Sequence, residues 1–323
     1  MARHTGGVSS ANRPEFPDEH SKGRFVRQDS AFRNRVCADS GAEFPAASGR
    51  YHLYVSLACP WAHRTIIVRR LLGLEDVISM SVVDPIRDER GWAFRSGSGH
   101  GPDPVNNFEF LSEAYLATDS GLSGRITVPV LWDTQTGRIV NNESSEIIVM
   151  LNGAFDEWGD GMLDLYPELH REEIDSINAR VYKNVNDGVY RSGFATTQEA
   201  YEEAVVPLFE TLDGLDRRLA GRRWLVGDTV TLADVRLFTT LVRFDAVYVQ
   251  HFKCNIRRIA DYEHLPGYLR DLYQQPAFGE TTNFDHIRRH YFLTHRSINP
   301  AGIIPAGPIL DLDAPPGRDD LII

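Results

Sequence analysis

The feature that most restricts how this chain can fold is a strand that passes directly into a helix through a Cys-Pro pair. Apolar residues at positions 51–57 alternate with His52 and Ser56, as expected for a half-buried strand. Pro60 has the fixed φ that suits the first position of a helix, and apolar residues then recur at helical spacing until a glycine that is a typical helix stop. The pattern predicts that Cys59 lies at the N-terminus of a helix.

This position favours a reactive thiol. The unpaired N–H groups and the dipole of a helix N-terminus stabilise the thiolate, which is the nucleophilic form. A dithiol redox motif would carry a second cysteine three positions later, but the chain has Ala62 there. The thiol that resolves a mixed disulfide on Cys59 must therefore come from another molecule. The alternative is an inert packed cysteine, which is our interpretation of Cys37 and Cys254 because neither lies at such a junction.

Composition is typical of a soluble globular protein long enough for two domains, with 323 residues, of which 42% are hydrophobic and 24% charged. The formal net charge of -11 disfavours nucleic acid and anionic membranes as partners. Three cysteines do not make a disulfide framework and fit a reducing compartment better. Because the sequence shows neither a signal peptide nor an apolar run of membrane length, we expect a cytoplasmic protein.

Changes of pattern divide the chain into four predicted parts. Residues 1–48 are polar with a few apolar anchors, among them Phe25-Val26 and Phe32. We expect them to form an extension that lies along the surface of a domain. Residues 49–155 predict a small α/β domain. Residues 165–295 show only helical patterns and predict an all-helical domain. Residues 296–323 form a tail rich in Pro and Gly, which predicts irregular structure.

Within the α/β part, strands are predicted at 77–83, 128–132 and 138–140, followed by a helix from Ser144. The connection 84–127 is long for a compact domain, which favours a functional role or a helix within it.

In the helical part, Thr196 with Glu199 and Thr231 with Asp234 each form a capping-box pattern ahead of an apolar periodic run.

Several segments from both halves of the chain together carry a resemblance to one family. They are Cys59-Pro60-Trp61-Ala62, Arg90-Gly91-Trp92-Ala93-Phe94, Arg125-Ile126-Thr127-Val128-Pro129-Val130-Leu131-Trp132-Asp133, Asn142-Glu143-Ser144-Ser145-Glu146-Ile147-Ile148, and Tyr182-Lys183 with Asn186, Gly188, Val189 and Tyr190. These segments resemble the glutathionyl-hydroquinone reductases, the Xi class of the glutathione transferase superfamily. The resemblance implies a thioredoxin-like N-terminal domain, an all-helical glutathione-transferase C-terminal domain and a homodimer formed through the helical domains.

The resemblance implies a glutathione site on the α/β domain. Val128-Pro129 is similar to the family's valine and cis-proline, whose backbone pairs with the cysteinyl backbone of glutathione. Glu143 would bind the ammonium of the γ-glutamyl end, and the hydroxyl and backbone N–H of Ser144 would bind its carboxylate. Without the resemblance, Ser144 would be interpreted as a helix N-cap.

The remaining implied site residues are aromatic or basic. Trp92 and Arg125 would supply an indole wall and a cation for the carboxylate of the peptide, although either could be ordinary packing or a solvated charge. Tyr190, Tyr248 and Tyr291 match positions that the family uses around its aromatic substrate. We expect Tyr190 to act as general acid and base, and the other two hydroxyls to orient the aromatic group and to donate to the Cys59 thiolate.

The implied reaction is the removal of glutathione from glutathionyl-hydroquinones by Cys59, with glutathione as co-substrate and no metal ion. One alternative is a thiol transferase or dehydroascorbate reductase similar to the omega class, which shares the cysteine chemistry but needs no tyrosines. A second alternative is a non-enzymatic interaction module. Such a module would have no reason to keep Cys59 at a helix end beside Glu143 and Ser144.

Overall fold

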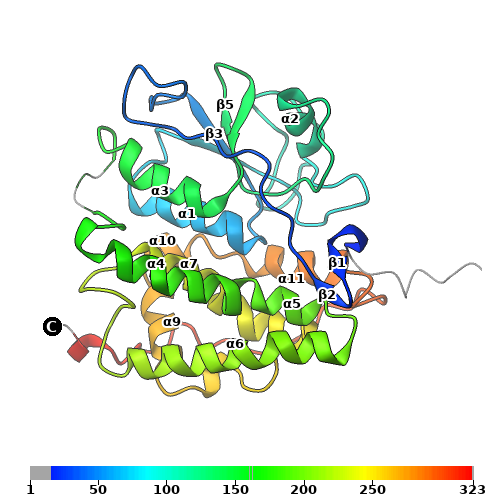
Figure 1. Cartoon of the computed structure of the whole chain (residues 1–323), viewed down its shortest axis with the longest axis vertical. Helices are drawn as coiled ribbons and strands as arrows, with labels where there is room; N and C mark the ends of the chain where they lie inside the picture. Colours follow the sequence, from blue (N-terminus) through cyan, green and yellow to red (C-terminus); the bar gives the residue numbers. More distant parts are fainter. Residues whose placement is uncertain (1–15, 160, 162, 322–323) are drawn as a thin grey trace, which may run out of the picture.

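A computed structural model of the chain describes residues 16–159, 161 and 163–321 and arranges them in two layers (Figure 1). The first layer contains a four-stranded sheet of order β4-β3-β5-β6, in which β3 pairs parallel with β4 and antiparallel with β5, and β5 pairs antiparallel with β6. Its elements are β3 (Tyr51–Val55), α1 (Pro60–Leu71), β4 (Ser79–Val82), α2 (Leu111–Thr118), β5 (Val130–Asp133), β6 (Arg138–Asn141) and α3 (Ser144–Ala154). This mixed sheet with its helices is the thioredoxin-like arrangement that the family resemblance implied.

Strand β3 is buried on both faces, so the prediction of a half-buried strand is wrong. The predicted polar face is covered by the connection between β4 and β5. The hydroxyl of Tyr54 donates to the carboxylate of Asp103 in this connection at 3.2 Å. The ring nitrogens of His52 lie 2.7 and 2.9 Å from the hydroxyls of Ser79 and Ser81 on the neighbouring strand β4. Because both faces of β3 are covered, its polar side chains find their hydrogen-bond partners on β4 and on the connection that follows β4.

Helices α1 and α3 pack side by side and lie between the sheet and the second layer (Figure 1). Helix α1 begins at Pro60 with Cys59 as its N-cap and ends before Gly73, which has a φ of 64° as expected for a glycine at a helix end. Helix α1 also packs against α7 of the second layer. The predicted junction of strand, cysteine and helix is therefore confirmed, and it lies where the two layers meet.

The second layer, within the residues that the structure describes, contains helices and no strand. Its main helices are α4 (Arg171–Val181), α5 (Gly188–Gly193), α6 (Gln198–Leu219), α7 (Leu232–Arg243), α8 (Val249–His251), α9 (Leu265–Tyr273), α10 (Pro276–Gly279) and α11 (Phe284–Thr294). Single π-helical turns, η4 (Tyr182–Asn186) and η5 (Phe244–Tyr248), follow α4 and α7. Residues 301–318 contain neither helix nor strand.

The two capping predictions have different outcomes. The Thr231 side chain accepts a hydrogen bond from Ala233 N–H, while Asp234 accepts one from Thr231 N–H at 2.9 Å, so this capping box is confirmed. The other prediction is wrong by one position, because Thr197 and not Thr196 caps α6, accepting from Ala200 N–H at 3.2 Å. The helix thus begins with a single side-chain cap, since the residue three positions after Thr197 is Ala200 and cannot complete a capping box.

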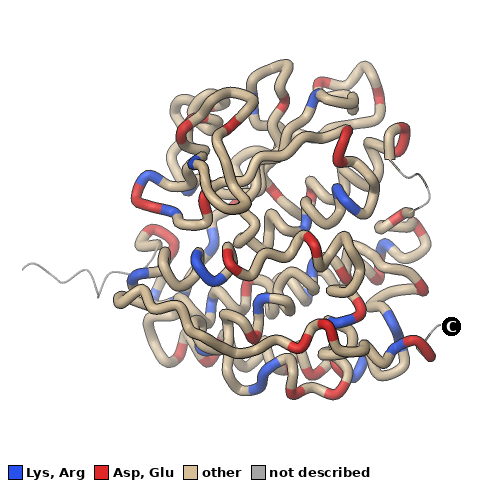
Figure 2. The backbone as a smooth tube through the Cα atoms, turned by 180° about the vertical axis from the view of Figure 1, so that it is seen from behind, with Lys and Arg blue, Asp and Glu red and all other residues tan. Residues whose placement is uncertain are grey.

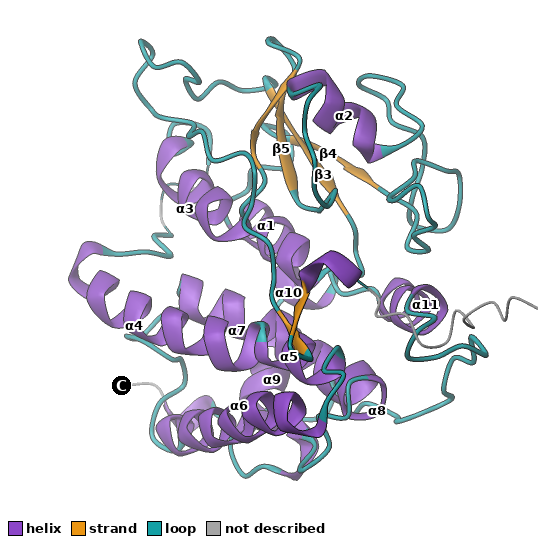
Figure 3. Ribbon diagram, turned by 45° about the vertical axis from the view of Figure 1, so that its right-hand side comes forward, coloured by secondary structure: helices purple, strands orange, loops and turns teal. Residues whose placement is uncertain are grey.

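Residues 1–15 of the predicted N-terminal extension lie outside the described residues, and residues 16–48 run across both layers (Figure 3). A short hairpin of β1 (His20–Ser21) and β2 (Arg24–Phe25) lies beside α5, and the chain then runs up to the sheet, where Asn34 N–H donates to Val140 O next to β6. Phe25 is buried and its ring packs 5.2 Å from that of Phe194, whereas Val26 is 55% exposed and is not the anchor that was predicted. The extension thus ties the edge of the sheet to the helical layer.

Charged residues of both signs are interspersed over the two layers (Figure 2). None of the helices in the part of the chain that the structure describes combines the length and the apolar character needed to cross a bilayer.

Candidate active site

A pocket of about 350 Å³ lies where the sheet, the helical layer and the N-terminal extension meet. Nine of the ten predicted site residues line it. They are Cys59, Trp92, Arg125, Val128, Pro129, Glu143, Ser144, Tyr190 and Tyr291. The tenth, Tyr248, is fully buried behind Tyr291 and does not line the pocket.

Cys59 is held by the turn that joins β3 to α1. Its Sγ faces the backbone N–H groups of Trp61 and Ala62 and lies 3.5 Å from Val128 O. Burial raises the pKa of the Cys59 thiol, and the two N–H groups offset part of that rise. Burial therefore opposes the helix-end effect that the sequence predicted, and a thiolate here depends on further positive charge in the site.

The peptide bond between Val128 and Pro129 is cis, as the resemblance implied, and both residues line the pocket, where Val128 O lies next to the thiol.

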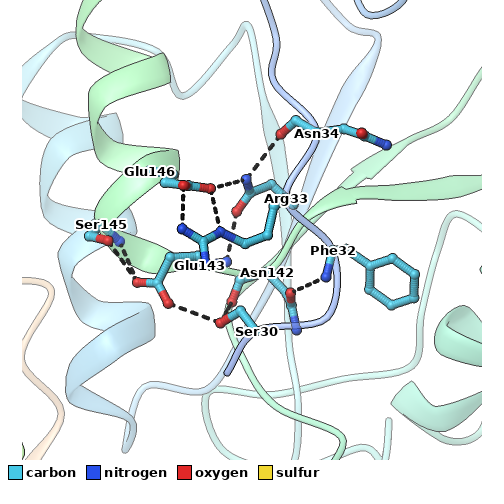
Figure 4. A network of polar contacts seen from close by, with 9 residues as sticks. Ser30, Phe32, Arg33, Asn34, Asn142, Glu143, Ser145 and Glu146 are labelled. Atoms are coloured by element: carbon cyan, nitrogen blue, oxygen red, sulfur yellow. Dashed lines mark hydrogen bonds and ion pairs between the residues drawn. The ribbon is translucent and has the colours of Figure 1, made fainter. Parts of the chain in front are cut away.

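Glu143 is held as a carboxylate at the start of α3 (Figure 4). It accepts hydrogen bonds from Ser145 N–H at 3.0 Å, from the Ser145 hydroxyl at 2.8 Å and from the Ser30 hydroxyl at 2.9 Å. Burial alone would raise its pKa, but these donors outweigh burial, so the pKa of Glu143 lies below its usual value. Glu143 is thus the N-cap of α3, and the alternative interpretation of Ser144 as that cap is wrong.

Ser144 is the first residue of α3, and its hydroxyl accepts a hydrogen bond from Arg64 at 3.3 Å. The same guanidinium donates to the Asn186 side chain at 2.7 Å and lies 4.5 Å over the Trp61 ring. Arg64 is buried, and no motif in the sequence pointed to it. It places a positive charge beside the helix start at which a carboxylate would bind.

Trp92 and Arg125 also line the pocket. The Trp92 ring stacks on the ring of His290, with centroids 5.0 Å apart. Arg125 donates to the Glu19 carboxylate at 2.7 Å and lies 4.2 Å over the Phe16 ring, so its charge is already paired within the protein. Burial, which is the main cause, and nearby arginines lower the pKa of Arg125 to about 10.

The hydroxyls of three tyrosines form a chain that opens into the pocket. The Tyr190 hydroxyl lies 2.5 Å from that of Tyr291, which lies 2.9 Å from that of Tyr248. These residues come from α5, α11 and η5 respectively. Burial, as the largest cause, raises the pKa of Tyr190, so its hydroxyl keeps its proton at neutral pH and can donate it.

The predicted hydrogen bonds from Tyr248 and Tyr291 to the Cys59 thiolate are not formed in the described residues. Both hydroxyls are used within the tyrosine chain instead, and Tyr248 reaches the pocket only through Tyr291.

Sequence reasoning missed the part of the site that the N-terminal extension supplies. Phe16, Phe25 and Arg27 all line the pocket. Arg27 pairs with Asp187 at 2.7 Å and lies 4.8 Å over the ring of Tyr190. These contacts join residues about 160 positions apart, and a polar segment without periodicity gives no signal for them.

Comparison with known proteins identifies the family. The glutathione S-transferase N-terminal domain matches residues 58–154, and the C-terminal domain matches residues 198–271. Glutathionyl-hydroquinone reductase YqjG of Escherichia coli (strain K12) is 55% identical over 312 residues, which cover 94% of this chain and 95% of that protein. The crystal structure of the glutathione-S-transferase Xi from Phanerochaete chrysosporium is 51% identical with a TM-score of 0.88, covering 91% of this chain and 95% of that one. The chain belongs to the Xi class of glutathione transferases.

The fold expected of an Xi-class glutathione transferase is thereby confirmed in both domains. A glutathione-bound structure of YqjG from Escherichia coli K-12 is 55% identical to this Xi-class chain, has a TM-score of 0.87 and covers 90% of this chain and 96% of that one.

Proposed function

We propose that this Xi-class protein is a glutathionyl-hydroquinone reductase, which uses glutathione to release hydroquinones and oxidised glutathione. The observation that carries the proposal is that the hydroxyls of Tyr190 and Tyr291 open on the same pocket as Cys59 and Glu143. Reducing a simple disulfide needs the thiol and a glutathione site alone. Phenols beside the thiol suit a substrate whose aromatic carbon must take up a proton.

The pocket suits glutathione at several points. The Glu143 carboxylate can accept the substrate ammonium, and Ser144 at the start of α3, beside Arg64, can hold the adjacent carboxylate. Arg125 has five N–H donors, one of which is on Glu19, so it can still bind the carboxylate at the other end of the tripeptide. The cysteinyl backbone would then lie along Val128, within reach of Cys59.

In the first half of the reaction, the Cys59 thiolate attacks the sulfur of the glutathionyl group. A sulfur–sulfur bond forms, the bond between sulfur and ring carbon breaks, and its electron pair goes to the aromatic fragment, where it is stabilised through a ring oxygen. Tyr190 supplies the proton that ends on the ring carbon. The products are a free hydroquinone and a mixed disulfide between Cys59 and glutathione.

In the second half, the thiolate of another glutathione attacks the glutathione sulfur of the mixed disulfide. Oxidised glutathione leaves, and the electron pair of the broken bond returns to Cys59. The proton that the second glutathione loses restores the Tyr190 hydroxyl, which closes the cycle.

Turnover of a glutathionylated hydroquinone with excess glutathione tests this proposal. We expect stoichiometric formation of the free hydroquinone and oxidised glutathione, measured by liquid chromatography. Reduction of dehydroascorbate without hydroquinone release would support the omega-like alternative. Inactivity with both substrates, in protein that binds glutathione, would support the non-enzymatic module.

The proposed intermediate can be located directly. Treatment with oxidised glutathione should add one glutathione to Cys59, because Ala62 leaves no thiol to resolve the adduct. Peptide mass mapping reads the site of addition. Cys254 is fully buried and serves as an internal control, whereas Cys37 is exposed and its labelling has to be compared with that of Cys59. Addition at Cys37 alone would contradict the assignment.

The proposed role of Glu143 predicts weaker glutathione binding in Glu143→Gln. A charge-assisted hydrogen bond contributes about 1.5 to 3 kcal/mol, so KM for glutathione should rise roughly tenfold or more. Glu146→Gln is the matched control, since Glu146 lies one turn further along α3 and binds Arg33 and Asn141 outside the pocket. Equal KM values in the two variants would contradict this role.

We also propose that the protein is a cytoplasmic homodimer. Its three cysteines are all unpaired, which suits a reducing compartment, and the Xi-class resemblance supports a dimer formed through the helical domains. Light scattering on the purified protein would measure the oligomeric state.

A further inference from the structure

Arg243, at the end of α7, reaches from the helical layer into the turn that carries Cys59. Its side chain is completely buried. Nε donates to Ala58 O at 2.9 Å, and one terminal nitrogen donates to Leu57 O at 3.1 Å. The other terminal nitrogen donates to Thr239 O at 2.8 Å and to Nδ1 of His63 at 3.0 Å. The guanidinium thus fixes the carbonyl groups immediately before the cysteine.

Every acceptor around Arg243 is neutral. Three are backbone carbonyls, and the fourth is His63, whose pKa is held well below its usual value by burial and by the Arg243 charge. Because a guanidinium can only donate, Nδ1 of His63 accepts, and Nε2 carries the proton toward the Thr281 hydroxyl 2.9 Å away. This histidine therefore supplies no negative charge.

A buried cation requires a counter-charge, and the structure offers one candidate beside Arg243. Arg27 and Arg50 pair with Asp187 and Asp133, whereas no carboxylate forms an ion pair with Arg243 among the residues that the structure describes. The residue that follows Ala58 is Cys59, which can become an anion. We propose that Arg243 is a positioning residue that supplies the fixed positive charge for the Cys59 thiolate and orients the turn that carries it.

Two other arginines face this site, but each of them, unlike Arg243, has a carboxylate nearby among the described residues. Arg27, on the extension, is neutralised by Asp187, and Arg64, on α1, lies nearer the glutathione-binding side and is accompanied by Glu143. On the far side of Arg243, burial is the largest cause that raises the pKa of Tyr248 and Tyr291 and lowers that of His290. The Arg243 charge offsets part of the rise for the two tyrosines and adds to the fall for His290. Arg243 is thus the cation shared by the thiol and by the inner end of the tyrosine chain.

The positive charge of Arg243 should also affect the rate at which the second glutathione regenerates the enzyme. This part of the inference rests on the proposed function. When Cys59 is joined to glutathione it is neutral, and Arg243 has lost its counter-charge. Attack by a second glutathione thiolate breaks the disulfide and returns the electron pair to Cys59 Sγ beside Arg243. A thiol with a lower pKa leaves faster, so Arg243 accelerates regeneration of the enzyme.

The test measures the pH dependence of Cys59 alkylation by iodoacetamide, followed by peptide mass mapping, in the full-length protein. In Arg243→Gln and Arg243→Met the midpoint should rise by about one to three pH units, because an opposite charge nearby has that effect on a pKa. Arg243→Lys keeps the charge and should stay closer to the parent. Arg69→Met is the control, since Arg69 is also buried and donates to backbone carbonyls, those of Glu75 and Ile78, away from the site.

A second measurement uses protein already carrying glutathione on Cys59. Its reduction by glutathione should be roughly 3- to 30-fold slower in Arg243→Gln than in the parent. Neither measurement needs a hydroquinone, so both can succeed even if the proposed enzymatic function is wrong. Equal alkylation midpoints in Arg243→Gln and Arg243→Lys would overturn the proposal, as would a loss of thermal stability in Arg243→Gln with an unchanged midpoint. If Arg243→Met fails to fold, the comparison of the glutamine and lysine variants still decides.

Discussion

Replacing Cys59 with alanine should abolish release of hydroquinone from glutathionyl-hydroquinones. No other thiol can take over its role, because Cys254 is buried away from the pocket and Cys37 does not line it. Cys59→Ser should keep at most a trace of activity, since a hydroxyl is far less acidic than a thiol and the helix end cannot ionise it. Steady-state turnover with a glutathionylated hydroquinone measures both effects.

A binding measurement must accompany these turnover assays, to show that the inactive variants still bind glutathione. The groups proposed to hold the tripeptide, among them Glu143 and Ser144, do not depend on the thiol for their hydrogen bonds. Calorimetric titration of Cys59→Ala with glutathione should therefore show binding close to that of the parent. Cys37→Ser is the matched control for loss of a thiol and should turn over normally. Normal turnover in Cys59→Ala would remove the proposed mechanism.

The parts of the fold that sequence predicts well are those set by neighbouring residues. The junction at Cys59 follows from one alternating segment, one proline and one helical period, and the structure has the strand, the cysteine and the helix in the predicted order, although the strand is buried on both faces. The cap at Thr231 and Asp234 is similarly local. The error at Thr196 shows the limit of such a local pattern, because Thr196 has the acidic residue three positions later, yet the adjacent Thr197 caps the helix without one.

The parts that sequence misses depend on contacts between distant segments. Burial of both faces of β3 depends on the long connection after β4, through residues such as Asp103. Arg243 reaches carbonyl groups 185 and 186 positions earlier in the chain. Neither contact leaves a periodic pattern, and an arginine in the last turn of a helix is ordinarily a surface residue that favours the helix dipole.

In the candidate site, too, the sequence predicts which residues are present but not the contacts that they make with distant segments. Family motifs led to nine residues that line one pocket, but a motif cannot show how each side chain is engaged. Arg125 is already paired with Glu19, and Tyr248 is placed behind Tyr291. These differences change the expected effects of mutation, because a residue that reaches the pocket through another should have the smaller effect.

Tyr190→Phe should separate hydroquinone release from general thiol chemistry. The variant loses the hydroxyl proposed to deliver the proton, and general acid-base groups contribute roughly 10²- to 10⁴-fold to rate. The ring itself should keep its place between Arg27 and Trp61, since phenylalanine retains the aromatic faces that these side chains contact. Reduction of a small glutathione mixed disulfide requires no proton on carbon, so it should persist in Tyr190→Phe while hydroquinone release falls.

The other two tyrosines provide graded controls for this prediction. Tyr291→Phe removes the hydroxyl 2.5 Å from that of Tyr190 and should cause a smaller loss, and Tyr248→Phe, one hydroxyl further from the pocket, should cause the smallest. Rates for both substrates are measured in parallel, so that a general loss of folded protein would lower both. If all three variants release hydroquinone at the parent rate, the tyrosines have no role in proton transfer. The omega-like alternative would then describe this pocket better, because the thiol and the glutathione site would account for all of its chemistry.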